Sequence, residues 1–196
     1  MSVERKDRID LAGAGWLVTF ALLMGINQVL VKLVNAGLAP VFQAGLRSVC
    51  ALVPVLIYAI LAKRKLSISD GSLVPGLMCG TLFAVEFMLT FKAFDYTSVA
   101  RATMLFYTMP FWLACAAHFL IPGERLTPLR VLGLLMAVAG VAWALVHNDH
   151  PATEYALLGD LMCLAAALCW AGIALLARTT ALSKSSPEMQ LIYQLA

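Results

Sequence analysis

The chain has 196 residues, of which 62% are hydrophobic and 13% are charged. Soluble globular domains are about half apolar and about a quarter charged, so this composition excludes a water-soluble protein with a large catalytic domain. A membrane-spanning helix needs about 20 apolar residues, and the length therefore accommodates about six to eight spans. We predict an all-α polytopic membrane protein.

Charge-poor apolar runs separate into six predicted membrane-spanning helices. In chain order, these spans cover residues 11–33, 41–61, 73–94, 99–121, 129–146 and 155–177. Proline and glycine punctuate the connections between them. A further apolar run begins at Met189 and reaches Ala196, which is shorter than a bilayer is thick. We interpret this run as the start of a seventh span in a chain that is truncated at its C-terminus.

The basic residues are concentrated in alternate connections. Ten of the 14 Lys and Arg residues share one side of the predicted membrane: Arg5, Lys6, Arg8, Lys63, Arg64, Lys65, Arg125, Arg130, Arg178 and Lys184. The opposite connections, 34–40, 95–98 and 147–154, contain neither Lys nor Arg. By the positive-inside rule, this pattern predicts a cytoplasmic N-terminus. Because the charges follow the membrane topology, the net charge of +3 does not indicate a nucleic-acid partner.

The sequence also contains a weak internal repeat. A shift of 146 residues places the start of 155–177 on the start of 11–33. With this shift, or one residue more, Arg178 corresponds to Lys32, Trp170 to Met24, Pro187 to Pro40 and Gln190 to Gln43. Five spans precede the second copy, so it would enter the membrane upside down, as in the inverted repeats of secondary transporters. We therefore predict a first repeat at 11–146 and an incomplete second repeat at 155–196.

Several segments together resemble a known family. They are Gly25 to Gln28 with Lys32, Gln43 to Arg47, Ala93 to Ala102, Tyr107 to Phe111, and Gly123 to Thr127. These segments are similar to the EamA-type domain of the drug/metabolite transporter superfamily, and the resemblance extends over residues 10–196. It implies one five-helix EamA repeat followed by the first helix and part of the second of an inverted repeat. Members typically have ten helices with both termini in the cytoplasm, and many bacterial members export amino acids or related metabolites.

Polar side chains lie at similar depth in four of the predicted spans. At about 1.5 Å per residue from one membrane face, Arg47 lies ~10 Å deep, Glu86 ~12 Å deep, and Asn27, Gln28 and Tyr107 at ~8–14 Å. A charge at the bilayer centre costs roughly 2.5–3.5 kcal/mol, so each charge needs a partner or a role. One interpretation is a structural ion pair between Arg47 and Glu86. The other is a substrate path that both residues line, with Glu86 as a candidate proton carrier.

Three further residues belong to the candidate substrate path, each with a structural alternative. Arg101 lies near an external turn, where it either anchors at the interface or reaches inward to Glu86 or a substrate carboxylate. Pro110 cannot donate to the carbonyl of Phe106, so it kinks its span and frees that oxygen, either for a cavity or as a packing kink. Trp170 either forms a cavity wall or packs between helices.

Other features favour structural roles. Asp160 is placed in the first turn of its span, where the helix dipole favours a carboxylate. Gly133, Ala137, Gly140 and Ala144 form a small-residue stripe that packs either within the chain or across a homodimer. The five cysteines have no metal-ligand spacing and are interpreted as packing residues. The three histidines, His118, His147 and His150, show none either, so we predict no metal and no cofactor.

These observations predict a secondary transporter that exports small metabolites such as amino acids across a bacterial inner membrane. Its partners would be the lipid bilayer and a small polar or amphipathic metabolite, with a proton as a candidate coupling ion. The sequence contains no Walker A motif, so it does not indicate transport driven by ATP hydrolysis. It also lacks paired deep carboxylates and a GxSG motif, which argues against an intramembrane enzyme. The alternative function is a truncated, non-transporting membrane protein or a helix-packing partner of another chain.

Overall fold

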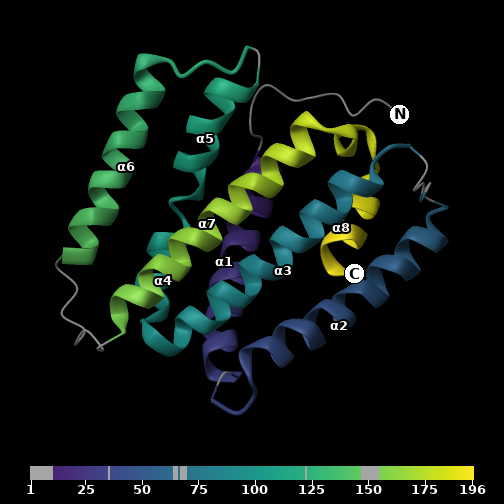
Figure 1. Ribbon diagram of the computed structural model, residues 1–196, viewed down its shortest axis with the longest axis horizontal. Coiled ribbons are helices and arrows are strands. Elements are labelled where there is room, and N and C mark those ends of the chain that lie inside the picture. Colours follow the sequence, from purple (N-terminus) through teal and green to yellow (C-terminus); the bar gives the residue numbers. More distant parts are fainter. Residues whose placement is uncertain (1–10, 35, 64–65, 67–69, 122, 147–154) are drawn as a thin grey trace.

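The computed structural model describes residues 11–34, 36–63, 66, 70–121, 123–146 and 155–196, and Figure 1 shows them as a bundle of helices. The helices are α1 (Leu11–Val34), α2 (Pro40–Leu61), α3 (Leu73–Tyr96), α4 (Val99–Phe106), α5 (Met109–Leu120), α6 (Pro128–Val146), α7 (Ala156–Thr179) and α8 (Pro187–Leu195), with a 3-10 turn at Ala181–Lys184. Six helical segments of the described chain are long and apolar enough to cross a membrane. The predicted all-α polytopic membrane protein is confirmed.

The ends of the predicted spans agree with those of the observed helices to within two residues. The last helix begins at Pro187 rather than at Met189, because local chemistry starts it earlier. Proline takes the first helical position, and the hydroxyl of Ser186 accepts a hydrogen bond from the backbone N–H of Met189 at 3.2 Å. Likewise, the hydroxyl of Thr127 accepts from the backbone N–H of Arg130 at 3.4 Å and caps α6.

The predicted kink at Pro110 is a complete break between α4 and α5. The two helices cross the membrane as one segment, Val99–Leu120. At the break, the hydroxyl of Thr108 donates to the carbonyl of Leu105 at 2.7 Å, and the indole N–H of Trp112 donates to that hydroxyl at 3.2 Å. These bonds partly replace the helical ladder that a proline interrupts.

The centre of the molecule is the antiparallel pair α3 and α7 (Figure 1). The break-containing segment α4–α5 packs on α7, and α1 lies behind the pair in this view. The main cluster of buried apolar side chains joins all these elements: Val31, Phe91, Ala93, Phe94, Ala102, Leu105 and Cys163. Gly159 permits the close approach of α7 to the end of α3, because a Cβ there would meet Tyr96 at 3.0 Å. Cys79 and Cys163 are buried and uncrosslinked, whereas Cys50 is exposed. The packing role of the five cysteines stays a prediction.

The short helix α8 packs on both α2 and α3. Its Tyr193 lies directly over two glycines one turn apart on α3. A Cβ at Gly76 would meet the Tyr193 ring at 2.5 Å, and a Cβ at Gly80 would overlap the backbone carbonyl of Tyr193. The lack of a side chain at Gly76 and Gly80 is therefore what lets α8 approach α3.

The peripheral helix α6 is far less embedded and forms the left edge of Figure 1. It contains no buried residue. A Cβ at Gly133 or Gly140 would meet nothing within 4 Å. Gly133 and Gly140 of the small-residue stripe therefore do not pack closely against the described part of the chain, whereas Ala144 is half-buried. A homodimer face stays a prediction.

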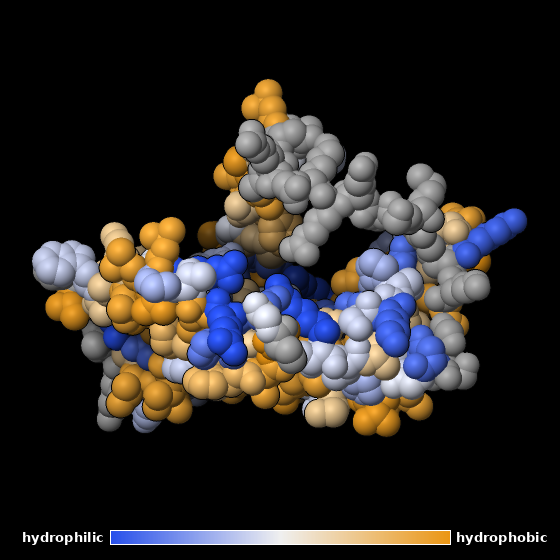
Figure 2. All heavy atoms as spheres, turned by 90° about the horizontal axis from the view of Figure 1, so that it is seen from above, coloured by the Kyte–Doolittle hydropathy of each residue, from blue (hydrophilic) through white to orange (hydrophobic). Residues whose placement is uncertain are grey.

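Five described basic residues follow the ends of α2, α5 and α7, on the upper side of the bundle in Figure 1: Lys63, Arg125, Arg130, Arg178 and Lys184. The other four lie within helices, nearer the ends on the opposite side: Lys32, Arg47, Lys92 and Arg101. Figure 2 views the molecule from the upper side and shows hydrophilic side chains across its middle and apolar ones around its rim. Part of the charge pattern lies outside the described residues, namely Arg5, Lys6, Arg8, Arg64, Lys65 and the whole connection 147–154 with His147 and His150.

Candidate substrate path

Glu86 is the acidic residue of the candidate path, and its side chain is deeply buried. It lies on α3 with 4% of its surface exposed. The hydroxyl of Thr90, one turn along the same helix, donates a hydrogen bond to Oε1 at 3.2 Å. Across the helix interfaces, its charge acts on Arg47 of α2 and on Cys169 of α7. Glu86 therefore lies where three helices meet.

Arg47 faces Glu86 from α2 but contacts an aromatic ring. Its guanidinium carbon lies 4.6 Å from the centroid of the Phe87 ring, a distance typical of a cation–π interaction. Phe87 is held edge-to-face between Phe83 at 4.5 Å and Phe91 at 5.2 Å between ring centroids. Among the described residues, no direct ion pair joins Arg47 to Glu86, although the two charges interact electrostatically. The predicted structural ion pair is therefore absent from this arrangement.

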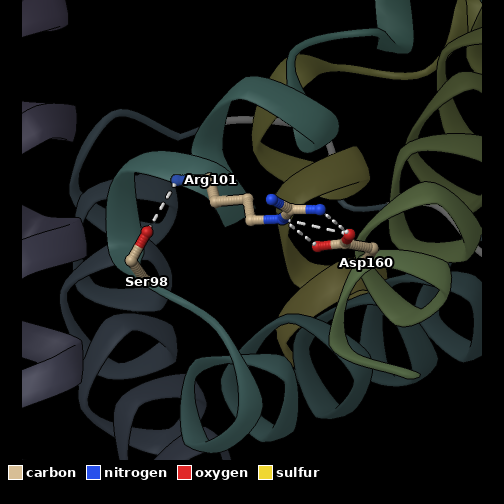
Figure 3. A network of polar contacts seen from close by, with 3 residues as sticks. All are labelled: Ser98, Arg101 and Asp160. Atoms are coloured by element: carbon tan, nitrogen blue, oxygen red, sulfur yellow. Dashed lines mark hydrogen bonds and ion pairs between the residues drawn. The ribbon is translucent and has the colours of Figure 1, made fainter. Parts of the chain in front are cut away.

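Arg101 forms a direct ion pair instead, with Asp160 of α7 (Figure 3). Its Nη2 lies 2.6 Å from Oδ2 of Asp160, and its Nε donates to both carboxylate oxygens at 2.9 and 3.0 Å. Ser98 caps α4 by accepting from the backbone N–H of Arg101 at 3.2 Å, which fixes the start of the helix that carries the guanidinium. This two-pronged ion pair joins α4 to α7, and Asp160 neutralises most of the charge of Arg101.

Asp160 is the fifth residue of α7, beyond its first turn. The helix-dipole interpretation of this residue was therefore wrong, since its side chain is engaged by Arg101. A usable signal was present in the sequence. Opposite charges stand near the start of two spans that begin on the same side of the membrane.

Tyr107 and Trp170 both lie near the ring of Phe106. The Phe106 ring is 5.9 Å from the Tyr107 ring and 6.5 Å from the Trp170 ring, measured between centroids. Tyr107 stands at the α4–α5 break and is 52% exposed. Trp170 also packs against the buried group of Cys79, Ile173 and Leu182. An aromatic wall therefore extends from the helix break to α7, one residue from Cys169.

Asn27 and Gln28 are half-buried on α1. Near its end, α1 is tied to the rest of the chain by the Lys32 ammonium, which donates to the carbonyl of Thr97 at 3.4 Å. Electrostatic interaction links Arg47 to Glu86, and the Phe106 ring links Trp170 to Tyr107. Within the described chain, no contact joins Asn27 or Gln28 to either pair. Two residues that the sequence did not single out, Thr90 and Phe87, are the direct neighbours of the two path charges. Thr90 was recognisable, because it stands four residues from Glu86 on one helix.

Pro110 lies elsewhere. It lines a cavity of about 410 Å³ between α5, α6 and α7, and the other predicted path residues do not line it. In the described chain, no group of three or more His, Cys, Asp or Glu side chains is placed to hold a metal ion.

Comparison with known proteins gives a family match. Residues 11–146 match the EamA-like transporter family. The chain is 26% identical over 160 residues to the uncharacterized transporter YoaV of Bacillus subtilis, covering 81% of this chain and 54% of that protein. It is 27% identical over 151 residues to a probable amino-acid metabolite efflux pump of Escherichia coli, covering 76% and 48%. Protein PagO of Salmonella typhimurium is 24% identical over 135 residues, covering 68% and 44%.

The chain therefore spans about half the length of the curated relatives it matches. No solved structure matches it significantly.

Proposed function

The chain belongs to the EamA-like transporter family, and on that premise we propose that it forms part of a secondary transporter that exports small metabolites such as amino acids. The name of the Escherichia coli relative, a probable amino-acid metabolite efflux pump, supports this substrate class and direction. The concentration of basic residues on one side supports a cytoplasmic N-terminus in a bacterial inner membrane.

We further propose that residues 155–196 begin a second, inverted repeat. Figure 1 supports this, because α1 and α7 run in opposite directions through the bundle. Each is followed by a short connection and a helix whose first residue is proline. In each case a glutamine reaches back to a carbonyl of the preceding segment: Gln43 Nε2 to Val31 at 3.4 Å, and Gln190 Nε2 to Leu182 at 2.7 Å.

The observation that carries the transport proposal is the unjoined pair of charges on α2 and α3. Glu86 is buried and receives one hydrogen bond from Thr90, and Arg47 is held by the Phe87 ring rather than by the carboxylate. A buried carboxylate and a half-buried guanidinium that do not contact each other retain unused hydrogen-bonding capacity, which costs free energy until a ligand uses it. An amino acid brings an ammonium for Glu86 and a carboxylate for Arg47. The adjacent aromatic rings suit an amphipathic side chain.

Flux measurements in proteoliposomes made from this chain test the proposal. We expect outward flux of labelled amino acids, reduced at least tenfold in Glu86→Gln, since a lost charged hydrogen bond costs about 1.5–3 kcal/mol. Asp95→Asn is the matched control, because Asp95 ends the same helix but is exposed and bonded only to Lys92 in the described chain. Loss of flux in both variants would contradict a specific role for Glu86.

The same vesicles test whether Glu86 carries a proton. If it does, a proton gradient accelerates flux in the native chain but does not accelerate the residual flux of Glu86→Gln. Residual flux that a gradient still accelerates contradicts the proton role but not the substrate role. Gradient-driven flux that is unchanged in Glu86→Gln contradicts both the proton role and the substrate role of Glu86. Absence of flux from the native chain, with the protein folded, favours the alternative of a non-transporting protein or a helix-packing partner.

A further inference from the structure

A second charged region, which does not include Glu86, lies around the cavity of about 410 Å³ between α5, α6 and α7. Its apolar wall comes from two helix faces. Pro110, Leu113, Ala114 and Ala117 stand three or four residues apart on α5, and Gly133 and Leu134 on α6 face them across the cavity. Along α5 this wall covers about seven residues, or ~10 Å at 1.5 Å per residue. The cavity is large enough for part of an amphiphile.

Three charged side chains also line this cavity: Glu124, Arg130 and Arg178. They come from the α5–α6 loop, the third residue of α6 and the end of α7, all on the basic side of the bundle. Charged groups therefore lie at the end of the cavity near the membrane–water boundary, and the apolar wall extends from them into the hydrocarbon. This is the polarity of a phospholipid rather than of a fully water-soluble ion.

The charges at the end of the cavity near the membrane–water boundary, which we call its mouth, do not cancel. Arg178 Nη1 lies 3.3 Å from Glu124 Oε2, and this pair is about half exposed. The Arg130 guanidinium has no ion-pair or hydrogen-bond partner within the described ranges, where only its backbone N–H is engaged, by Thr127. One positive charge is therefore left at the mouth, and a second is only weakly bound. Two guanidinium groups with free donors are well suited to a phosphate.

From this geometry we propose that the cavity binds the phosphate head group of an anionic phospholipid, with an acyl chain against the apolar wall of α5 and α6. Bound there, the lipid would fill the space beside α6, which has no buried residue of its own. The site shares only Pro110 with the candidate substrate path, and neither Glu86 nor Arg47 lines it.

Binding to the purified full chain tests the proposal, with phosphatidylglycerol, phosphatidylcholine and inorganic phosphate as separate probes. We expect phosphatidylglycerol to bind more tightly than phosphatidylcholine. The preference should fall about fivefold in Arg130→Gln, the factor expected for one basic residue at an anionic lipid surface. Arg125→Gln is the matched control, because Arg125 is an exposed arginine of the adjoining α5–α6 loop that does not line the cavity. Equal losses in both variants would overturn the proposal in favour of general surface attraction.

Two further variants separate the parts of the site. Glu124→Gln frees Arg178 and should strengthen phosphatidylglycerol binding; weaker binding would contradict the assigned role of the charges. Gly133→Leu places apolar atoms in open space within the cavity, so it should reduce lipid binding without affecting inorganic phosphate. If inorganic phosphate binds as strongly as phosphatidylglycerol and Gly133→Leu changes neither, the site takes a free anion and the lipid proposal fails.

Discussion

Two pairs of opposite charges on neighbouring membrane-spanning helices are arranged differently. Arg101 and Asp160 meet in a forked ion pair with a closest distance of 2.6 Å. Arg47 and Glu86 face each other without direct contact, although Glu86 is the more deeply buried of the two carboxylates. The first pair joins α4 to α7, and the second lies between α2 and α3. An arginine and a carboxylate therefore form a direct ion pair in one place, which we call the closed pair, and remain apart in the other, which we call the open pair.

The difference follows from what a buried charge needs. A charge in the membrane is costly unless it is paired or faces a polar cavity. Arg101 and Asp160 satisfy each other, so their contact can stabilise the fold in every state of the protein. Glu86 and Arg47 rely on Thr90 and Phe87, which are weaker partners than an opposite charge. An open pair is useful only if something else occupies it for part of the time, as a transported substrate does.

The largest expected effect comes from breaking the closed pair. Arg101→Leu leaves the Asp160 carboxylate of α7 without its ion-pair partner. We expect a loss of about 3 kcal/mol in the free energy of unfolding, at the low end of the range for such pairs. Reversible unfolding in detergent or mixed micelles measures it. Glu86→Gln, by contrast, removes a charge with no ion pair and should change stability far less.

A double variant shows whether the contact itself is responsible. Arg101→Leu with Asp160→Leu removes both charges and should recover most of the lost stability, because apolar replacements of buried pairs are often neutral or stabilising. A double variant as unstable as Arg101→Leu would mean that packing of the Arg101 stem, rather than the ion pair, is what joins α4 to α7.

The sequence was sufficient for the spans but not for these pairings. Each span is a local property, because apolar runs, proline positions and caps such as Ser186 are encoded within a few residues. The break at Pro110 was predictable for the same reason, since a missing N–H acts on the adjacent turn. The depth of Glu86 and Arg47 followed from counting residues.

Which side chains meet across helices depends on the rotation of each helix about its axis and on which helices are neighbours. A single sequence encodes neither directly. Arg101 was therefore assigned to the candidate path before its partner on α7 was known, and Asp160 was assigned to a helix dipole. The stripe at Gly133 and Gly140 shows the same limit, because small residues permit close packing without specifying a partner.

The next largest effect concerns helix α8 and its role in holding Arg47 and Glu86 in position. Helix α8 packs on both α2 and α3, so it helps to fix Arg47 opposite Glu86. Gly80→Ala puts a methyl group into the backbone of Tyr193 and should displace α8 at a cost of about 1–3 kcal/mol, as overpacking does. Thermal unfolding measures the loss. Gly140→Ala is the matched control, because its methyl group would meet nothing within 4 Å. Equal effects of the two changes would mean that helix propensity, not the contact with α8, dominates.

The smallest effect concerns Asp70, an exposed carboxylate outside the membrane spans whose hydrogen-bond donors, among the described residues, are all neutral. Hydrogen bonds from the side chain and the backbone N–H of Ser72, and from the Ser185 hydroxyl, hold the pKa of Asp70 below its ordinary value of 3.8. Because the folded-state pKa is the lower one, the ionised carboxylate stabilises the fold above its unfolded pKa, and this contribution disappears as the pH falls through the folded-state pKa. Unfolding temperatures between about pH 2 and pH 5 should therefore fall less steeply in Asp70→Asn than in the native chain. Ser185→Ala, which removes one donor and leaves those of Ser72, should give an intermediate slope. Parallel profiles for all three proteins would mean that these neutral donors, unlike the ion pair at Arg101, do not couple the α2–α3 loop to the segment before α8.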